Sequence, residues 1–226
     1  MQGYKNIASE FSATRQYLWP ELLIFKKYLK NGQKILDLGC GNGRLVKLFD
    51  GFNVDYLGLD VNEELIKLAK EQNSDKNFAT ADILSFDANE KFDLIFMVAV
   101  LNHFNKAERK IVLDKVYSAL KPGGYLLMTN WNMLNLKNKK SWWRSKHDHD
   151  AVITNWGEAA ELVYYVFSKR TARAELKDFN LELNLYFSKG QRTNFLFGNN
   201  LVTVARKVEV KSFVEKESRQ TAAAAT

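Results

Sequence analysis

Three aspartates stand at equivalent places in the chain, each at or near the end of a short apolar segment. Asp37 lies in ILDLGCGNG, Asp60 ends VDYLGLD, and Asp82 lies in ATADIL. A carboxylate at such a place can accept hydrogen bonds from ribose hydroxyls or an amino group, and it can attract a cation. Each aspartate by itself could equally cap a helix, because Asp is favoured at helix N-termini. Three of them in register with successive strands favour one shared binding site.

The glycines after Asp37 help to decide which kind of ligand this site binds. Gly39, Gly41 and Gly43 let the backbone turn tightly and approach a ligand without an intervening Cβ. The third glycine comes one place too early for the Gly-x-Gly-x-x-Gly loop of dinucleotide sites, where Asp37 would also face a pyrophosphate. A cationic ligand suits Asp37 better, and the methionine part of S-adenosylmethionine carries an ammonium and a sulfonium. Cys40, between the glycines, is interpreted as a packing residue rather than a nucleophile.

An alternation of strands and helices beginning at residue 34 must position these side chains. Strands are predicted over residues 34–38, 54–60, 77–82, 92–100 and 123–131, and helices over 45–49, 63–70 and 106–120. This order predicts an α/β fold with a Rossmann-like, doubly wound and mostly parallel sheet, helices on both faces, and ligands at the carboxyl ends of the strands. A helix near residues 171–177 and strands at 179–187 and 199–207 predict an antiparallel end to the sheet.

The chain is predicted to form a single domain over residues 1–212, since 226 residues with 46% hydrophobic content suit one core. Residues 1–30 are predicted to form a helical cap of two short helices, the second beginning at Pro20. Residues 133–160 are predicted to be an exposed basic insertion, and residues 213–226 a disordered tail. Cys40 is the one cysteine, so no intramolecular disulfide can form. The sequence contains no signal peptide and no apolar run long enough to span a membrane, which predicts a cytoplasmic protein without a membrane partner.

Positive charge is concentrated in the C-terminal part of the chain. The net charge is +7, and residues 131–226 hold 16 Lys and Arg against 10 Asp and Glu. This excess favours a polyanionic partner such as nucleic acid, although it could serve solubility alone. Trp142 and Trp143 in the insertion could stack on unpaired bases or fold back as a lid. His147 and His149 alternate with aspartates, but no further ligand stands nearby, so no metal site is predicted.

Five segments resemble, in their order and spacing, the motifs of class I S-adenosylmethionine-dependent methyltransferases: ILDLGCGNG, YLGLD, TADIL, FDLIF and LKPGGYLL. The resemblance covers about residues 34–130. It implies S-adenosylmethionine as the cofactor and a seven-stranded sheet whose last strand is antiparallel. It assigns Asp37, Gly39, Gly41 and Asn42 to the methionine portion, Asp60 to the ribose, Asp82 and Ile83 to the adenine, and Val61 and Val98 to the same cofactor site.

A narrower resemblance reaches outside the cofactor motifs. The segments YKNIASEFSATRQYLWP, VAVLNHFNKAERK, NWNM and YYVF are similar to the tRNA methyltransferases that esterify 5-carboxymethyluridine at the wobble position. That family carries His-His where this chain has Asn102-His103, and Tyr-Tyr-His where it has Tyr164-Tyr165-Val166. The resemblance implies a tRNA anticodon loop as partner, a methyl ester as product and, as in the eukaryotic relatives, a small activating protein.

The side chains expected to meet the acceptor come from separate segments. His103 and Arg15 are the candidate catalytic residues, and the candidate substrate contacts are Arg15, Asn102, Trp142, Trp143 and Tyr164. His103 could instead cap a helix, and Arg15 could form a surface ion pair. An acceptor carboxylate is already ionised at neutral pH and needs positioning, whereas a hydroxyl or amine would need His103 as a base.

Two other functions stay open at this point. The first is a small-molecule or quinone-type methyltransferase, which would share the cofactor motifs. The second is a non-catalytic subunit that binds the cofactor and activates a partner, because a fold alone does not establish turnover. The C-terminal charge and the N-terminal pattern favour tRNA over the first alternative, and the intact set of cofactor residues argues against the second.

Overall fold

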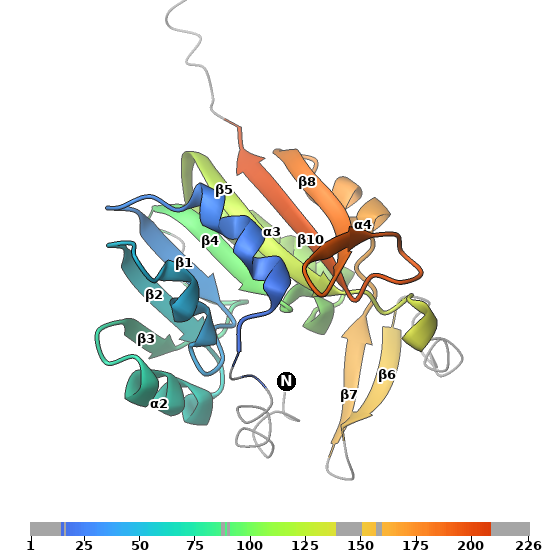
Figure 1. The fold of residues 1–226 in the computed structure, drawn as a ribbon, viewed down its shortest axis with the longest axis horizontal. Coiled ribbons are helices and arrows are strands. Elements are labelled where there is room, and N and C mark those ends of the chain that lie inside the picture. The colour runs from blue at the N-terminus through green and yellow to red at the C-terminus, as the bar shows by residue number, and fades with distance from the viewer. Residues whose placement is uncertain are drawn as a thin grey trace, which may run out of the picture.

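The centre of the molecule is one mixed sheet. The computed structural model describes residue 15 and residues 17–86, 89, 91–138, 151–156 and 160–208, with the backbone alone for 138, 151–156 and 160–162. Within this part the sheet has eight strands in the order β3-β2-β1-β4-β5-β10-β8-β9 (Figure 1). The strands are β1 (Lys34–Leu38), β2 (Asp55–Asp60), β3 (Asn77–Thr80), β4 (Phe92–Val98), β5 (Leu120–Trp131), β8 (Phe179–Ser188), β9 (Gln191–Thr193) and β10 (Asn200–Lys207).

Strand directions confirm the predicted α/β class. β1, β2, β3, β4 and β5 pair in parallel, whereas β10 is antiparallel to both β5 and β8. The resemblance implied seven strands, and the sheet has one more because β8 turns back into the short β9. The backbone makes this turn at Lys189 and Gly190, which both have positive φ (52° and 79°).

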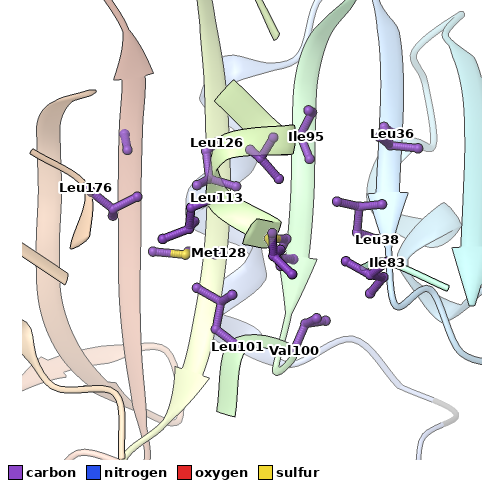
Figure 2. Close-up of a cluster of buried hydrophobic side chains, with 14 of the residues drawn as sticks. Leu36, Leu38, Ile83, Ile95, Val100, Leu101, Leu113, Leu126, Met128 and Leu176 are labelled. Atoms are coloured by element: carbon purple, nitrogen blue, oxygen red, sulfur yellow. The ribbon is translucent and has the colours of Figure 1, made fainter. Parts of the chain in front are cut away.

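Helices cover both faces of the sheet and bury the apolar side chains that alternate along the strands. The 3₁₀ helices η2 (Pro20–Tyr28) and η3 (Arg44–Phe49) and the helix α2 (Glu63–Gln72) pack on one face, with Ile35 and Phe96. Helices α3 (Lys106–Ala119) and α4 (Lys169–Glu175) cover the other. Figure 2 shows the second core, where Leu36 and Leu126 of the strands gather with Leu113 of α3. Each such side chain contributes about 1.5–3 kcal/mol by leaving water.

Side chains at the helix N-termini explain where the helices begin. Asn62 accepts hydrogen bonds from the N–H groups of Glu64 and Leu65 at the start of α2. Asn105 and Glu108 form a reciprocal capping box at the start of α3. Pro20 stands in the first turn of η2, which confirms the predicted helix start. The first of the two helices predicted in residues 1–30 lies outside the described residues, as does the tail at 213–226.

The region predicted as a basic insertion contains regular structure at both ends. The 3₁₀ helix η5 (Leu136–Asn138) lies at its start, and a separate antiparallel pair, β6 (Ala151–Trp156) and β7 (Ala160–Tyr165), lies at its end. No strand was predicted in these residues, so β6 and β7 depart from the prediction. Figure 1 shows the pair projecting beyond the carboxyl end of β5. No helix among the described residues is both long enough and apolar enough to cross a bilayer.

Candidate active site

The glycine loop after β1 has the backbone conformation that the sequence predicted. Gly39, Gly41 and Gly43 all have positive φ, at 72°, 56° and 75°. A Cβ on Gly39 would lie 2.6 Å from Cγ2 of Val100, so no larger residue fits there without displacement. The N–H groups of Gly39 and Cys40 both donate to the carbonyl of Leu59, which joins the loop to the end of β2.

Asp60 holds the glycine loop and the start of α2 together. Its Oδ2 accepts a hydrogen bond from the N–H of Gly41 at 2.9 Å, and its Oδ1 accepts one from the N–H of Asn62 at 2.9 Å. Burial raises the pKa of Asp60, while these backbone donors oppose the rise. Each carboxylate oxygen can accept a second hydrogen bond, so a ligand hydroxyl can be bound as well.

Asp37 is buried beside Asp60 at the bottom of the site. Its side chain is 1% exposed, and its Oδ2 accepts a hydrogen bond from the hydroxyl of Tyr56 at 2.8 Å. Burial raises the pKa of Asp37 to about 7; the Tyr56 hydrogen bond lowers it and the charge of Asp60 raises it further. A positively charged ligand group near this carboxylate would favour its ionised form.

A first pocket opens at the carboxyl ends of β1, β2 and β4, where the fold predicts ligands. Of the residues assigned to the cofactor, Asp82 alone does not line it. Asp82 is exposed, and its Oδ1 accepts a hydrogen bond from the N–H of Leu84 at 2.9 Å. The lining includes Asp37, Gly39, Gly41, Asn42, Asp60, Val61, Ile83 and Val98. Acids, glycine backbone and apolar side chains thus converge as a cationic nucleoside ligand requires.

Two arginines line the same pocket, and one of them was not singled out from the sequence. Arg15 is 9% exposed, and its guanidinium carbon lies 5.9 Å from the centre of the Trp131 ring. Arg44 lies over the ring of Trp19 at 4.3 Å. Burial, followed by the positive charge of Arg15, lowers the pKa of Arg44 to about 10. Among the described residues, no hydrogen-bond partner meets the buried Nη1 of Arg44. This end of the pocket can therefore hold an anion.

His103 lies at the end of the pocket, in the 3₁₀ turn η4 (Leu101–His103). Its ring centre is 4.9 Å from that of Tyr164 and 6.1 Å from that of Trp131. Burial lowers the pKa of His103 to about 4, the charge of Arg15 lowers it too, and a hydrogen bond to the backbone of Ala99 opposes the shift. The ring is therefore neutral at physiological pH.

Backbone strain marks the same place. Ala99, directly after β4, has a φ of 58° and lines the pocket, and its N–H donates to the carbonyl of Thr129 at 2.8 Å. A left-handed conformation costs a residue with a Cβ about 1–2 kcal/mol. Such strain is typical of sites where the backbone must approach a ligand.

Asn102 joins the pocket wall instead of lining it. The side chain is fully buried; its Nδ2 donates to the carbonyls of Trp131 (3.3 Å) and Tyr165 (2.9 Å). Its Oδ1 accepts from the N–H of Trp131 at 2.8 Å. These hydrogen bonds connect η4 to β5 and β7, so Asn102 positions Trp131 and the hairpin. Because its amide groups bind the backbone, Asn102 does not make the direct substrate contact that was predicted.

The remaining candidates divide between the described and the undescribed parts of the chain. Tyr164 is buried and packs between His103 and Trp131, with ring centres 4.9 Å apart in both pairs. Trp142 and Trp143 lie outside the described residues, as does the His147–Asp150 segment. Arg44 could have been noticed in the sequence, because a cation directly follows Gly43 of the glycine loop. No local signal pointed to Ala99.

Comparison with known proteins agrees with this geometry. A family model described as a methyltransferase domain matches residues 29–181, which run from the end of η2 into the start of β8 and include the strands β1 to β5. The chain belongs to this methyltransferase family. The class of enzyme indicated by the sequence motifs is thereby confirmed.

Relatives of this methyltransferase include a named tRNA enzyme. The tRNA (carboxymethyluridine(34)-5-O)-methyltransferase of Arabidopsis thaliana is 34% identical over 132 residues, which cover 57% of this chain and 31% of that protein. Across the first curated relatives, the methyltransferase spans between 21% and 46% of their lengths.

Solved structures share the fold at low sequence identity. A SAM-dependent methyltransferase from Methanosarcina mazei has a TM-score of 0.69 and 22% identity, covering 85% of this chain and 99% of its own. A methyltransferase in complex with the Trm112 methyltransferase activator of Haloferax volcanii has a TM-score of 0.69 and 16% identity, covering 92% and 97%. The methyltransferase therefore has the fold of S-adenosylmethionine-dependent methyltransferases.

Proposed function

We propose that this methyltransferase uses S-adenosylmethionine to esterify the carboxymethyl group of a 5-carboxymethyluridine at the wobble position of tRNA. The observation that supports this most is the pair of arginines, the buried Arg15 and the half-buried Arg44, in the same pocket that carries Asp37 and Asp60. The acids suit a cationic donor, and the arginines suit an anionic acceptor. The similarity to tRNA (carboxymethyluridine(34)-5-O)-methyltransferases names an acceptor with that charge.

The residues of the pocket fit S-adenosylmethionine. Asp37 and Asp60 offer acceptor oxygens for its ammonium and ribose hydroxyls, Gly39 and Gly41 keep the loop free of side chains, and Ile83 is an apolar wall for the adenine. When bound, this cofactor supplies an electrophilic methyl group on a sulfonium. All of these residues line the same pocket, as contacts to a single ligand require.

The chain's own residues then have to position the acceptor rather than activate it. A carboxylate is ionised at neutral pH, so no base has to remove a proton from it. Arg15 can bind the carboxylate or a nearby phosphate, and the neutral ring of His103 lines the approach with no charge of its own. Apolar and aromatic walls exclude water, which favours a reaction that neutralises opposite charges.

The proposed function also includes a partner protein and a location in the cell. The solved complex with an activator shares this fold, and within the part of the chain that the structure describes β3 is an edge strand with three exposed residues. An open edge can pair with a strand of another protein. We propose that a small activating protein assists the methyltransferase in the cytoplasm. To test this, the tagged chain is purified from its own cells together with any protein that co-purifies. Its turnover is then compared with and without that protein.

The acceptor is tested by chemical stability of the product. The methyltransferase and labelled cofactor are incubated with tRNA bearing 5-carboxymethyluridine and with the same tRNA lacking it, and the products are treated with mild alkali. A methyl ester releases its label in alkali, so alkali-labile label on the modified tRNA alone supports the proposal. Label that survives alkali, or transfer to both tRNAs alike, would point to a different acceptor atom.

A further inference from the structure

A second pocket lies next to the first and is not used by the cofactor assignment. Its volume is about 540 Å³, which is within the range of small-molecule sites. The aromatic side chains of Trp19, Trp131 and Tyr164 and the polar side chains of Glu21 and Asn200 line it. These residues come from η2, β5, β7 and β10, so the pocket exists only in the folded chain.

Two cation–π pairs connect the two pockets. Arg44 lines the first pocket and lies over the ring of Trp19, which lines the second. Arg15 lines the first pocket and lies over Trp131, which lines both. A flat ligand between the aromatic rings of the second pocket would therefore be next to the anion-binding end of the first.

The polar side of the second pocket is a buried carboxylate. Glu21 is 3% exposed and Asn200 is 7% exposed, and Nδ2 of Asn200 donates to Oε1 of Glu21 at 3.2 Å. Asn200 pairs with Trp131 in the register of β10 and β5, so these two side chains are neighbours on one face of the sheet. The described residues give the Glu21 carboxylate this single side-chain donor, and Glu21 lines the pocket, so its remaining acceptor capacity is available to a ligand there.

We propose that the second pocket binds the uracil base of the acceptor nucleotide, with the N3–H of the ring donating to the carboxylate of Glu21. This inference rests on the function proposed above and adds the residue that selects the base. Uracil presents an N–H at position 3, whereas cytosine presents a lone pair there, which a carboxylate repels. The rings of Trp19 and Trp131 can stack on the base, as aromatic side chains do in sites for unpaired nucleotides.

The lysines at the rim of the second pocket can bind the phosphates on either side of the base. Lys137 and Lys189 line the pocket, and both are exposed. Lys189 stands at the β8–β9 turn and Lys137 in η5, so the two cations come from separate elements. Cations at the mouth of a base pocket attract phosphates without reading sequence, which leaves base selection to Glu21.

The inference is tested by equilibrium binding of anticodon stem-loops that differ at one base. The native methyltransferase, saturated with demethylated cofactor, is titrated with loops carrying 5-carboxymethyluridine, its N3-methyl derivative, or 5-carboxymethylcytidine. Loss of a hydrogen bond to a buried carboxylate should weaken binding of the second and third loops about tenfold or more. Equal affinity for all three loops overturns the inference, and this comparison needs no variant protein.

A substitution then identifies the residue. In Glu21→Gln, the amide can keep its oxygen toward Asn200 and present an N–H to the base, so the preference for uridine over cytidine should fall at least tenfold. Glu71→Gln, on the exposed surface of α2, is the matched control and should keep the preference. Cofactor-product affinity and thermal melting establish that each variant is folded.

Methyl transfer is measured on the same loops to separate the two proposals. A folded Glu21→Gln protein that keeps the full uridine preference contradicts the base assignment and leaves the methyl-transfer function standing. A native protein that prefers the uridine loop but transfers no methyl group to it contradicts the proposed function and supports the base pocket.

Discussion

At the scale of single residues, the site combines acids that are expensive to ionise with cations that are expensive to bury. Asp37 and Arg44 are both desolvated. Burial raises the pKa of Asp37 and lowers the pKa of Arg44, so in both cases it favours the neutral form. A ligand that carries a positive group toward Asp37 and a negative group toward Arg44 relieves both costs at once. Ligand binding should therefore be coupled to protons.

Cofactor binding is expected to release a proton near neutral pH. The pKa of Asp37 in the free protein is about 7, so a substantial fraction of this carboxyl is protonated at pH 6.5, and a cationic ligand lowers that pKa. Affinity should rise as pH increases from about 6 to about 8. Calorimetry at pH 6.5 in buffers of different ionisation enthalpy measures the released proton.

Asp37→Asn serves as the control for this experiment. It should bind the cofactor more weakly and without the proton release, because the amide does not titrate. If the native protein shows the same heat in every buffer, Asp37 is already ionised before binding, and the assignment of its role must change.

At the scale of elements, the glycine loop shows how space and backbone conformation act together. Gly39 and Gly32 both have positive φ, at 72° and 78°, so alanine at either position carries a similar backbone cost of about 1–2 kcal/mol. A Cβ on Gly39 would meet Val100, whereas a Cβ on Gly32 would have no atom within 4 Å. The difference between the two positions is therefore packing alone.

Gly39→Ala is expected to lose about 1–3 kcal/mol more unfolding free energy than Gly32→Ala, through overpacking against Val100. It should also lose cofactor affinity, because the loop must move to accommodate the methyl group. Urea unfolding and calorimetry on both variants measure this. Equal stability of the two would mean that Val100 moves aside freely.

Helices α3 and α4 are joined by a buried ion pair, and its arginine also hydrogen-bonds to the backbone of the residue that follows His103. The guanidinium of Arg109 donates to both carboxylate oxygens of Glu175, from Nε at 2.9 Å and from Nη2 at 2.8 Å. Its Nη1 donates to the carbonyl of Phe104 at 3.0 Å, directly after η4. The arginine side chain is 2% exposed.

Glu175→Gln is expected to cost about 3–5 kcal/mol of unfolding free energy, because it leaves the Arg109 charge buried without its counter-ion. The exposed pair of Lys110 and Asp114 on α3 offers a matched control, and Asp114→Asn should change stability by less than about 1 kcal/mol. Denaturant unfolding compares them. A small effect of Glu175→Gln would show that water reaches Arg109.

At the scale of the whole molecule, the two pockets meet at Trp131, the last residue of β5. Residues 131–226 carry most of the net charge of +7, and two of their lysines, Lys137 and Lys189, line the second pocket. A tRNA that inserts a base there would bring phosphates to this rim. Binding should then depend on salt.

The affinity for tRNA is expected to fall as the salt concentration rises. Replacing Lys137 with Gln and Lys189 with Asn should make this dependence weaker, reducing the magnitude of the slope of log affinity against log salt concentration by about 1–2. Asn tolerates the left-handed backbone at position 189. Lys67→Gln with Lys70→Gln, two exposed positions on α2, is the control. Filter binding between low and physiological salt measures the slopes; an unchanged slope in the pocket variant would place the tRNA elsewhere.

The sequence by itself determined the parts whose signals are local. The strand and helix order over residues 34–131, the helix start at Pro20 and the need for glycine in the loop all follow from patterns a few residues long, and the structure agrees with each of them. Asp37 and Asp60 were found because they stand at the carboxyl ends of neighbouring strands in a parallel sheet. Asp82 followed the same rule but bonds its own turn, since a short polar side chain can satisfy nearby backbone first.

Only the tertiary structure decided which side chains share a pocket. The stacking of Arg44 on Trp19, the packing of Tyr164 between His103 and Trp131, and the contact of Glu21 with Asn200 join residues far apart in the chain. Asn102 was predicted to touch substrate, yet its bonds to Trp131 and Tyr165 depend on β5 and β7 meeting at η4. Such contacts depend on long-range packing, and no periodicity in a linear sequence encodes the distance between two strands.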